Sequence, residues 1–488
     1  MEKLKRKIKK ILPRKFFRAL QPAYHFILSW LSNIVFSRPS QRLVVIGVTG
    51  TTGKTSSVVL IAKTLASTGY KVGYTSTAMF CDGDREWIND KKMTMIGGFF
   101  TSRLLRRMVK NKCQYAVIET TSEGIRQFRH RFINYDVLVF TGLYPEHIES
   151  HGSFENYKKA KGELFAHLKR CRTKYVNDKK FVERPQSQLQ KLNWQRVKKT
   201  IVANYDDENA DYFLNFWAEL KIGYTSEIFH EKSEEIGLNE NIKSNPELIK
   251  CANVKADAFG TGFDVILDSD FFVSAEDNLN SAHIDLKLLG DFSAVNSMTA
   301  VGVGLSQGLS LTQIKTGLEK IKGIMGRLEM INAGQNFSVV VDYAFEPKAV
   351  AKLYETVKLL PHNKIIHVLG SAGGGRDRSR RPVLGQLAGE NADYVVITNE
   401  DPYDEDPMVI ISEVAFGAEK AGKKANINLF KILDRQEAIK KALKLAKEGD
   451  IVLITGKGSE QAICGANGQK ISWDDRTAAR EELAKICG

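Results

Sequence analysis

Residues 46–57, "IGVTGTTGKTSS", place glycines and threonines around a single lysine, directly after an apolar run. The apolar run predicts a buried strand, and "KTSSVVLIAKTLASTG" predicts the helix that follows. A loop between a strand and a helix N-terminus can hold phosphates with its backbone N–H groups. Lys54 would then reach the terminal phosphates and Thr55 would bind Mg²⁺. The strict P-loop pattern requires glycine where Val48 stands, so two alternatives stay open, a variant nucleotide site and a glycine turn that binds nothing.

Acidic residues and histidines that follow two predicted strands suggest a metal site near this loop. Glu119 ends the strand "YAVIE", at the sheet edge where ligands of open α/β sheets bind. Oxygen ligands there suit Mg²⁺, which keeps several waters. After the next strand, "YPEHIESHG" holds Glu146, His147, Glu149 and His151. Because the chain has no HExxH motif, a zinc site is not supported.

Lys161 lies within the apolar stripe of a predicted helix, which is formed by Tyr157, Leu164, Phe165 and Leu168. A buried ammonium without a partner is costly, so Lys161 should have a partner or a modification. A buried lysine can lose its proton, and the neutral amine can take up CO₂ as a carbamate, a new anion for Mg²⁺. The pattern alone favours the simpler alternative, a lysine at a helix edge whose charge reaches water.

Three stretches of the C-terminal part are suited to binding polar substrates. "GSAGGGRDRSRRP" sets glycines before four arginines, which can bind carboxylate or phosphate in bidentate fashion. "TNEDPYDEDP" and "TGKGSE" end predicted strands. Since ligands bind at the carboxyl ends of parallel strands, we expect both stretches to face the first part of the chain.

Apolar strands alternate with helical patterns from residue 43 onward, which predicts an α/β fold with parallel sheets. We expect a central P-loop-type parallel sheet followed by a smaller Rossmann-like α/β unit. The chain of 488 residues also favours more than one domain. The predicted parts are an N-terminal segment over 1–42, a central ATP-binding domain over 43–322 and a C-terminal α/β domain over 323–488. Residues 175–290 are more polar, and "EKSEEIGLNENIKSN" within them is predicted to be a loop excursion.

The net charge of +14 is concentrated at the N-terminus, where residues 1–18 hold nine Lys or Arg against one Glu. Apolar residues recur at helical spacing in "LKRKIKKIL", which predicts a basic amphipathic helix. The apolar stretch that follows, residues 22–36, is shorter than a membrane span of about 20 residues. No small-residue cleavage site follows it, which argues against a signal peptide. Two alternatives stay open for residues 1–36, a helix packed on the first domain and an interfacial helix in contact with anionic lipid.

The composition limits the class of protein and its compartment. Hydrophobic and charged residues, 43% and 26% of the chain, are typical of a soluble globular protein. The six cysteines form no CxxC pair and fit reduced thiols in a cytosol. No base-reading motif accompanies the basic terminus, so no nucleic acid is expected as a partner. We therefore expect a cytoplasmic protein, peripheral at the inner face of the membrane if the N-terminal helix binds lipid.

The chain resembles the Mur ligases. "GVTGTTGKTS" is similar to their ATP loop, whose usual form is GTNGKT, with Thr52 where Asn is common. The other matching motifs, in family order, are "IETTSEGIRQFRH", "EHIESHGSFENYKKAKGELF", "GDFSAVNSMTA", "GRLEMI", "VDYAFEP", "GGGRDRSRRP", "EDPYDEDP" and "GKGSE". Within the family they are most similar to the ligases that add the third amino acid of the peptidoglycan stem peptide.

The resemblance implies an ATP- and Mg²⁺-dependent ligase that adds a lysine-like amino acid or diaminopimelate to a UDP-MurNAc-dipeptide acceptor through an acyl phosphate. It implies a monomer whose partners are these small molecules, and four catalytic residues, Lys54, Glu119, His147 and Lys161. The implied ATP-binding residues are Gly50, Thr51, Thr52, Gly53, Lys54, Thr55, Ser56, Asn296 (adenine side), Arg327 (phosphates) and Asp342 (ribose). The implied Mg²⁺ ligands are Thr55, Glu119, His147 and a carbamylated Lys161. The implied acceptor residues are Thr94, Thr121, Ser122 and Arg129. The implied residues for the incoming amino acid are Arg376, Asp401, Pro402, Tyr403, Gly456 and Glu460.

Two departures from the family pattern bear on the substrates. Family members usually begin with a domain that binds the uridine nucleotide, whereas 42 residues precede the first predicted strand here. Glu400, Asp401, Pro402 and Tyr403 stand where diaminopimelate-adding members carry DNPR, so an acid and a tyrosine replace an amide and a cation. This change should favour an amino acid with a free distal amine, although Arg376 retains diaminopimelate as a candidate.

Other functions stay open on these departures. One is a related ligase with a different acceptor, folylpolyglutamate-like, cyanophycin-like or a lipid-linked muropeptide. Another is an ATP-binding module recruited to the membrane without ligase activity. The "EDP" turn and "GKGSE" argue against a folylpolyglutamate-like or cyanophycin-like ligase, whereas the short segment before the first predicted strand argues for one. The full set of motif residues around Lys54 argues against the module without ligase activity.

Overall fold

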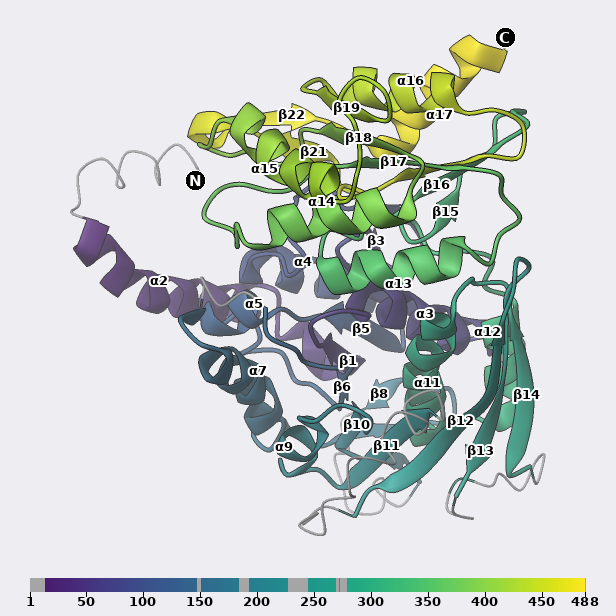
Figure 1. The fold of residues 1–488 in the computed structure, drawn as a ribbon. Coiled ribbons are helices and arrows are strands. Elements are labelled where there is room, and N and C mark those ends of the chain that lie inside the picture. Colours follow the sequence, from purple (N-terminus) through teal and green to yellow (C-terminus); the bar gives the residue numbers. More distant parts are fainter. Residues whose placement is uncertain are drawn as a thin grey trace.

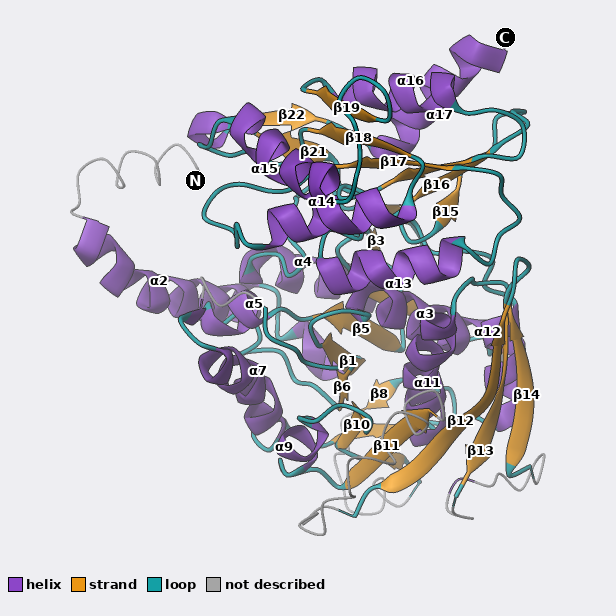
Figure 2. Cartoon of the chain, in the orientation of Figure 1, coloured by secondary structure: helices purple, strands orange, loops and turns teal. Residues whose placement is uncertain are grey.

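Two sheets organise the computed structural model, which describes residues 14–146, 151–183, 193–226, 245–268, 272 and 279–487. An eleven-stranded sheet lies in the lower half of Figure 1 and a six-stranded sheet in the upper half. Figure 2 shows helices packed around both sheets. The predicted α/β class is therefore confirmed. We propose residues 43–322 and 323–488 as two domains, each built on one of these sheets.

The large sheet is parallel over its middle seven strands and antiparallel at both ends, with the order β14-β13-β12-β11-β10-β6-β1-β5-β2-β3-β4. Its strands are β1 (Val44–Thr49), β2 (Val72–Thr75), β3 (Met79–Cys81), β4 (Glu86–Ile88), β5 (Tyr115–Glu119), β6 (Val137–Phe140), β10 (Thr200–Asn204), β11 (Leu220–Ser226), β12 (Glu247–Ala256), β13 (Thr261–Leu267) and β14 (Ser281–Leu286). Every residue of β1, β5 and β6 is buried, which explains why these strands read as continuous apolar runs.

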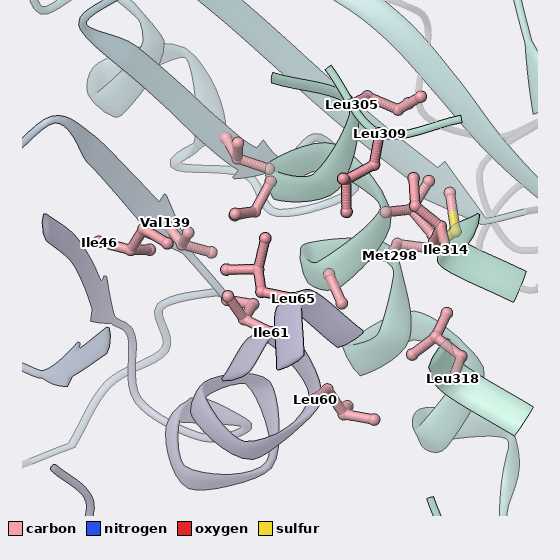
Figure 3. Packing of buried hydrophobic residues seen from close by; sticks show 14 of the residues in the cluster. Ile46, Leu60, Ile61, Leu65, Val139, Met298, Leu305, Leu309, Ile314 and Leu318 are labelled. Carbon is pink, nitrogen blue, oxygen red and sulfur yellow. The ribbon is translucent and has the colours of Figure 1, made fainter. Parts of the chain in front are cut away.

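Helices cover both faces of this sheet. On one face, α3 (Lys54–Ser67), α11 (Asp291–Ser306) and α12 (Leu311–Glu319) pack against alternate residues of the strands. Figure 3 shows Ile61 and Leu65 of α3 beside Ile46 and Val139 of the sheet. On the other face lie α4 (Gly98–Lys110), α5 (Ser122–Arg126), α7 (Phe154–Leu168) and α9 (Ala210–Leu214). This double cover fixes the carboxyl ends of β1, β5 and β6 at one edge, where the predicted site residues lie.

The six-stranded sheet has the order β15-β16-β20-β17-β18-β19 and is parallel except for β15. Its strands are β15 (Glu329–Met330), β16 (Ser338–Val341), β17 (Ile365–Leu369), β18 (Tyr394–Thr398), β19 (Leu429–Ile432) and β20 (Ile451–Ile454). Its helices are α13 (Pro347–Val357), α14 (Arg380–Asn391), α15 (Pro407–Lys420), α16 (Arg435–Leu445) and α17 (Asp475–Cys487). The smaller elements are the hairpin of β21 (Ala462–Cys464) and β22 (Lys470–Ser472), the 3-10 turns η1 (Pro39–Arg42) and η3 (Ala466–Gly468), and the sheet of β7 (Lys174–Val176), β8 (Val182–Glu183) and β9 (Gln195–Val197).

The polar stretch 175–290 contains more strand than its composition suggested. Three long strands, β12 to β14, extend the large sheet, and alternate residues of β13 are buried. Such alternation is typical of an antiparallel strand with one face covered, so these strands lack a continuous apolar run. The predicted loop excursion, residues 231–245, lies almost wholly outside the described residues.

Helix α2 (Arg14–Val35) precedes the first sheet and packs against α4 (Figure 1). Its Phe26 ring contacts the rings of Phe128 and Phe132, and its Ser32 Oγ lies 3.2 Å from Ser102 Oγ. The basic helix predicted for residues 4–12 lies outside the described part of the chain. No helix in that described part is both long and apolar enough to cross a membrane.

Candidate functional site

The loop between β1 and α3 requires glycine at position 53. Gly53 has φ +77°, and a Cβ added to it would lie 2.5 Å from Asn296 Oδ1 of α11. An L-residue would thus be strained and would also clash with that side chain. The close approach places Asn296, the residue predicted for the adenine side of ATP, directly beside the loop.

Hydrogen bonds from the β6–α7 connection hold the loop in shape. Thr51 N donates to Gly142 O at 2.8 Å, and Thr141 Oγ1 donates to Thr52 O at 2.6 Å. The first bond of the helix runs from Ser57 N to Gly53 O, so the amides of residues 54–56, Ser56 among them, lie at the open N-terminus of α3. Such amides and the helix dipole favour a bound anion.

The Lys54 ammonium lies over this loop, where its Nζ donates to Thr51 O at 2.5 Å. Burial lowers the pKa of Lys54, and nearby Arg327 lowers it further, while Glu119 and Glu346 oppose the shift. The side chain is therefore placed among charged groups from both domains, as the predicted contact with terminal phosphates requires.

The Thr55 hydroxyl joins three elements. It donates to Glu119 Oε2 at the end of β5 over 2.9 Å and accepts from Arg327 Nη2 over 3.2 Å. Glu119 is fully buried and also accepts from Thr77 N at 2.7 Å. A hydroxyl beside a carboxylate fits Mg²⁺, which takes oxygen ligands and few protein groups. The described residues contain no group of three or more His, Cys, Asp or Glu that could hold a metal.

Lys161 is buried beneath the same loop, with 1% of its surface exposed. Its Nζ donates to Gly50 O at 2.7 Å, lies 3.5 Å from Thr49 Oγ1 and sits 4.8 Å from the centroid of the Tyr157 ring. Burial lowers the pKa of Lys161 well below its ordinary value, and Lys54 lowers it further. The structure thus confirms that Lys161 lies in the buried face of its helix and contradicts a lysine that reaches water.

The acidic and histidine-rich stretch after β6 is only partly described. His147 and Glu149 lie outside the described residues, so the predicted role of His147 in binding Mg²⁺ stays a prediction. His151 is buried, and its Nε2 lies 3.1 Å from Ser122 Oγ. Burial lowers the pKa of His151 below its ordinary value, which favours the neutral ring.

The residues predicted for the acceptor gather near Glu119. Thr121 caps α5 by accepting from Gly124 N at 3.1 Å, and Ser122 is the first residue of that helix. The Thr77 hydroxyl lies 2.9 Å from Thr94 Oγ1 and 3.0 Å from Glu119 Oε1. Arg129 donates through Nη1 to Met95 O, in the same loop as Thr94. Predicted positions from two stretches of the sequence, the loop of Thr94 and the motif that holds Thr121, Ser122 and Arg129, therefore lie near the end of β5.

Arg327 and Asp342 stand where the second domain meets the phosphate loop. The Arg327 guanidinium lies 4.6 Å from the centroid of the Tyr343 ring. Asp342 accepts from Leu328 N at 2.8 Å and Ala344 N at 2.6 Å, so it fastens the backbone on both sides of β16. Burial raises the pKa of Asp342. Its predicted contact with ribose stays a prediction beside this structural role.

Asp401, predicted to bind the incoming amino acid, already has two lysine partners. Lys92 Nζ lies 2.5 Å from Asp401 Oδ1 and 2.6 Å from Oδ2, and Lys457 Nζ lies 3.0 Å from Oδ1. Cys464 N donates to Oδ1 at 2.7 Å. Burial alone would raise the pKa of Asp401, but Lys457 and Lys92 outweigh it and lower the pKa. The negative charge of Asp401 is therefore balanced within the protein.

Two other acids of this pocket differ in their pairing. Glu460 accepts from Lys457 Nζ at 2.6 Å and from Tyr343 Oη at 3.0 Å. Glu400 is 4% exposed, and its Oε2 has no hydrogen-bond partner. Burial raises the pKa of Glu400. A Cβ on Gly456, which has φ +101°, would lie 2.6 Å from Glu400 Oε2, so a side chain at position 456 would displace the Glu400 carboxylate.

The remaining predicted residues frame the same pocket. Tyr403 has φ +52°, donates from its backbone N to Cys464 O at 3.0 Å, and follows the buried Pro402. Burial raises the pKa of Tyr403 to about 12. Arg376 is exposed in the loop after β17, and its charge lowers the pKa of Tyr403 slightly against that trend.

Reasoning from the sequence missed several residues of this site. They are Thr77, Lys92, Tyr343, Glu346 and Lys457. Glu346 accepts from Tyr144 Oη at 3.2 Å and so joins the two domains. Tyr343, Glu346 and Lys457 stand inside the motifs "VDYAFEP" and "GKGSE", which could have signalled them. Lys92 and Thr77 lie outside every quoted motif.

Comparisons with known proteins agree with this geometry. Residues 48–239 match the Mur ligase middle domain, and residues 326–458 match the Mur ligase, glutamate ligase domain. The chain is 33% identical over 467 residues to a UDP-N-acetylmuramyl-tripeptide synthetase of Roseiflexus sp., an alignment that covers 95% of this chain and 83% of the relative. It is 32% identical over 451 residues to a UDP-N-acetylmuramoyl-L-alanyl-D-glutamate–2,6-diaminopimelate ligase of Geobacillus kaustophilus, with 92% and 81% covered.

Among solved structures, a UDP-N-acetylmuramoyl-L-alanyl-D-glutamate–2,6-diaminopimelate ligase is similar to the chain with a TM-score of 0.54 and 26% identity. The match covers 92% of this chain and 79% of that structure. The likeness therefore extends over both sheets rather than over the phosphate loop alone.

Substitution of Gly53 by alanine tests the phosphate loop. We expect Gly53→Ala to weaken Mg²⁺-ATP binding by about tenfold or more, because strain of about 1 kcal/mol at positive φ adds to the clash with Asn296. Equilibrium dialysis with labelled ATP measures the change. Gly69→Ala is the matched control, because Gly69 has φ +91° but open space around its Cβ position. Equal ATP affinity for the two variants would contradict the assignment of this loop.

Proposed function

This chain belongs to the Mur ligase family, whose members are ATP-dependent ligases, and from that premise we propose that it adds an amino acid to a UDP-MurNAc-dipeptide acceptor in peptidoglycan precursor synthesis. The amino acid is lysine-like or diaminopimelate. The names of the two relatives at 33% and 32% identity support this choice of acceptor and reaction.

The observation that carries the proposal is the contact between the two domains at Thr55. Arg327, just after the proposed domain boundary, donates to the Thr55 hydroxyl over 3.2 Å, while Thr55 opens the helix of the phosphate loop. A ligase of this kind must bring ATP, an acceptor carboxylate and an amine together, and here the residues proposed for all three converge around one sheet edge.

The proposed reaction has two chemical steps. An oxygen of the acceptor carboxylate attacks the γ-phosphorus of ATP. The bond between that phosphorus and the β,γ-bridging oxygen breaks, ADP departs, and the acceptor is left as an acyl phosphate. The amine nitrogen then attacks the acyl carbon, and the tetrahedral intermediate expels inorganic phosphate and loses a proton to give the amide. Lys54, Arg327 and the amides of residues 54–56 stabilise the charge on the transferring phosphoryl group. Mg²⁺ held by Thr55, Glu119, His147 and Lys161 would neutralise phosphate charge when bound.

The pairing of the acids bears on the incoming amino acid. Asp401 is balanced by Lys92 and Lys457, whereas Glu400 is a buried acid with an unpartnered oxygen. We therefore assign the distal amine of a lysine-like substrate to Glu400 rather than to Asp401. Arg376 would serve the distal carboxylate of diaminopimelate, should that be the substrate.

We also propose that Lys161 carries a carbamate. Its amine is buried, its pKa is lowered by burial, and no carboxylate pairs with it among the described residues. The neutral amine attacks CO₂, a N–C bond forms, and one proton is released to leave a carbamate anion. That anion would add a negatively charged ligand for Mg²⁺ to the carboxylate of Glu119.

The apolar face of α2 supports a peripheral contact with anionic lipid. Ile27, Trp30, Leu31, Ile34 and Val35 of this helix are exposed, Ile27 by 58% and Val35 by 56%. Nine Lys or Arg against one Glu within residues 1–18 precede this face in the sequence. Apolar side chains next to a cluster of cations are the pattern of an interfacial helix on an anionic bilayer.

Phosphate release tests the proposed reaction. We expect the chain with ATP, Mg²⁺ and UDP-MurNAc-L-Ala-D-Glu to release phosphate when one of lysine, ornithine or diaminopimelate is added, and not when either substrate is omitted. Other amino acids serve as controls. Turnover that ignored every amino acid, or required a different acceptor, would overturn the proposal.

Removal of the Lys161 amine tests the carbamate. Lys161→Met should lower kcat by about 10²-fold or more, since it deletes a charged group at the phosphoryl site. The exposed neighbour Lys159→Met should leave kcat unchanged. Carbon-13 NMR of the unaltered chain in labelled bicarbonate should show a carbamate resonance that Lys161→Met lacks, and its absence from the unaltered chain would contradict the modification.

Cosedimentation with vesicles tests the lipid contact. The full chain should sediment with vesicles that contain phosphatidylglycerol more than with phosphatidylcholine alone, because both charge and apolar area contribute. Trp30→Ser together with Leu31→Ser should reduce the bound fraction severalfold, since each removes apolar area. Phe416→Ser, which removes an equally exposed apolar side chain from α15, is the control. Unchanged sedimentation of the double variant would refute a role for α2.

A further inference from the structure

Lys92 reaches across the domain boundary from a loop of the first domain, and the proposed reaction gives Lys92 itself no role. The loop joins β4 to α4 and also carries Thr94. Asn89 Nδ2 holds it by donating to Ser76 O at 2.9 Å and Met93 O at 3.0 Å. Lys92 itself has φ +51°, an uncommon conformation for a residue with a side chain. Such strain persists only where surrounding contacts fix the residue.

The Lys92 ammonium is enclosed by oxygens of the other domain. Its Nζ lies 2.5 and 2.6 Å from the two Asp401 oxygens, 2.7 Å from Ala462 O and 3.4 Å from Glu460 Oε2. Only 6% of the side chain is exposed. Burial would lower the pKa of Lys92, but the two carboxylates outweigh it and raise the pKa.

Among the described residues, the buried ion pairs between residues 43–322 and 323–488 are the two that Lys92 makes, with Asp401 and with Glu460. The other ion pair across that boundary, Lys352 with Asp291, is 3.5 Å long and well exposed. Taking charges out of water is costly, and a buried pair is kept only where its geometry is good. The position of Lys92 is therefore specified by the fold rather than left to solvent.

Two chains of contacts lead from this ion pair to the phosphate loop. Through the first, the loop that carries Lys92 connects by Thr94 and Thr77 to Glu119, and Glu119 accepts from Thr55. Through the second, Glu460 accepts from Tyr343 Oη, the Tyr343 ring lies under Arg327, and Arg327 donates to Thr55. The residues proposed for the acceptor and for the amino acid thus belong to one closed ring of contacts.

We infer that Lys92 is a positioning residue that couples the acceptor site to the amino acid site. The inference rests on the proposed function, which assigns Thr94 to the acceptor and Asp401 and Glu460 to the amino acid pocket. An acceptor bound at Thr94 fixes the loop, the fixed loop holds Lys92, and Lys92 orients the two carboxylates. By thermodynamic linkage, the acceptor and the amino acid each raise the affinity of the protein for the other by the same factor.

Equilibrium dialysis measures this factor. The ligand is whichever of lysine, ornithine and diaminopimelate gives the highest phosphate release. Its dissociation constant is determined with and without UDP-MurNAc-L-Ala-D-Glu, in the presence of Mg²⁺ and a non-hydrolysable ATP analogue. In the unaltered chain the acceptor should tighten amino acid binding about fivefold or more. Lys92→Met should bring the factor close to one, and Lys92→Arg should restore part of it.

Lys91→Met is the matched control, since Lys91 is the neighbouring lysine and pairs with Asp90 at the surface. It should keep the factor of the unaltered chain. A merely structural role for Lys92 would lower thermal stability and weaken both ligands alike without changing the factor. A factor of one in the unaltered chain, or a factor unchanged in folded Lys92→Met, would overturn the inference.

Hydrogen exchange of the unaltered chain provides a second measurement that does not depend on a variant. Addition of the amino acid alone should slow amide exchange in residues 89–95, and unaltered exchange there would contradict the coupling. Failure of the proposed function is distinct, because it would appear as a lack of amino acid-dependent phosphate release in the unaltered chain.

Discussion

The site depends on two hydrogen bonds of the Thr55 hydroxyl, one that it donates and one that it accepts. The hydroxyl donates to Glu119, at the end of a central strand, and accepts from Arg327, just beyond the first domain. For both contacts to exist, β1 and β5 must be adjacent in the sheet, α3 must begin at Lys54, and the second domain must lie against the first. The parallel register that pairs Val48 with Glu119 satisfies the first condition.

Buried charge is the second organising feature, and its pairing differs from residue to residue. Among the residues that the structure describes, Lys161 has carbonyl and hydroxyl partners and no anion, Asp401 has two lysines, and Glu400 has an oxygen with no partner. Because desolvation disfavours an isolated charge, a group left unpaired in the protein is the one that gains most from a ligand or a modification. A buried charge that is paired within the protein therefore has a structural role, whereas one without a partner of opposite charge is a candidate for binding a ligand or carrying a modification.

The sequence was most informative where a residue and its neighbours share a local pattern. The buried strands and the helix after the phosphate loop follow from continuous apolar runs, and the burial of Lys161 follows from the stripe around it. The role of Lys92 has no such signal, since its partner Asp401 lies 309 residues away. The preference for a distal amine was predicted from the acid Asp401, since the sequence does not show the lysines that neutralise it. The strands β12 to β14 were not predicted, because a strand with one covered face alternates buried with more exposed residues, as β13 does, and shows no continuous apolar run.

The packing of α2 on α4 has a geometric consequence for the acceptor. Helix α4 begins at Gly98, directly after the loop that carries Thr94, and α2 lies along that helix (Figure 1). Any surface on which α2 rests would therefore fix the tilt of the enzyme relative to that surface and the direction from which an acceptor reaches Thr94. The entrance of the site would then be held at a constant height above that surface.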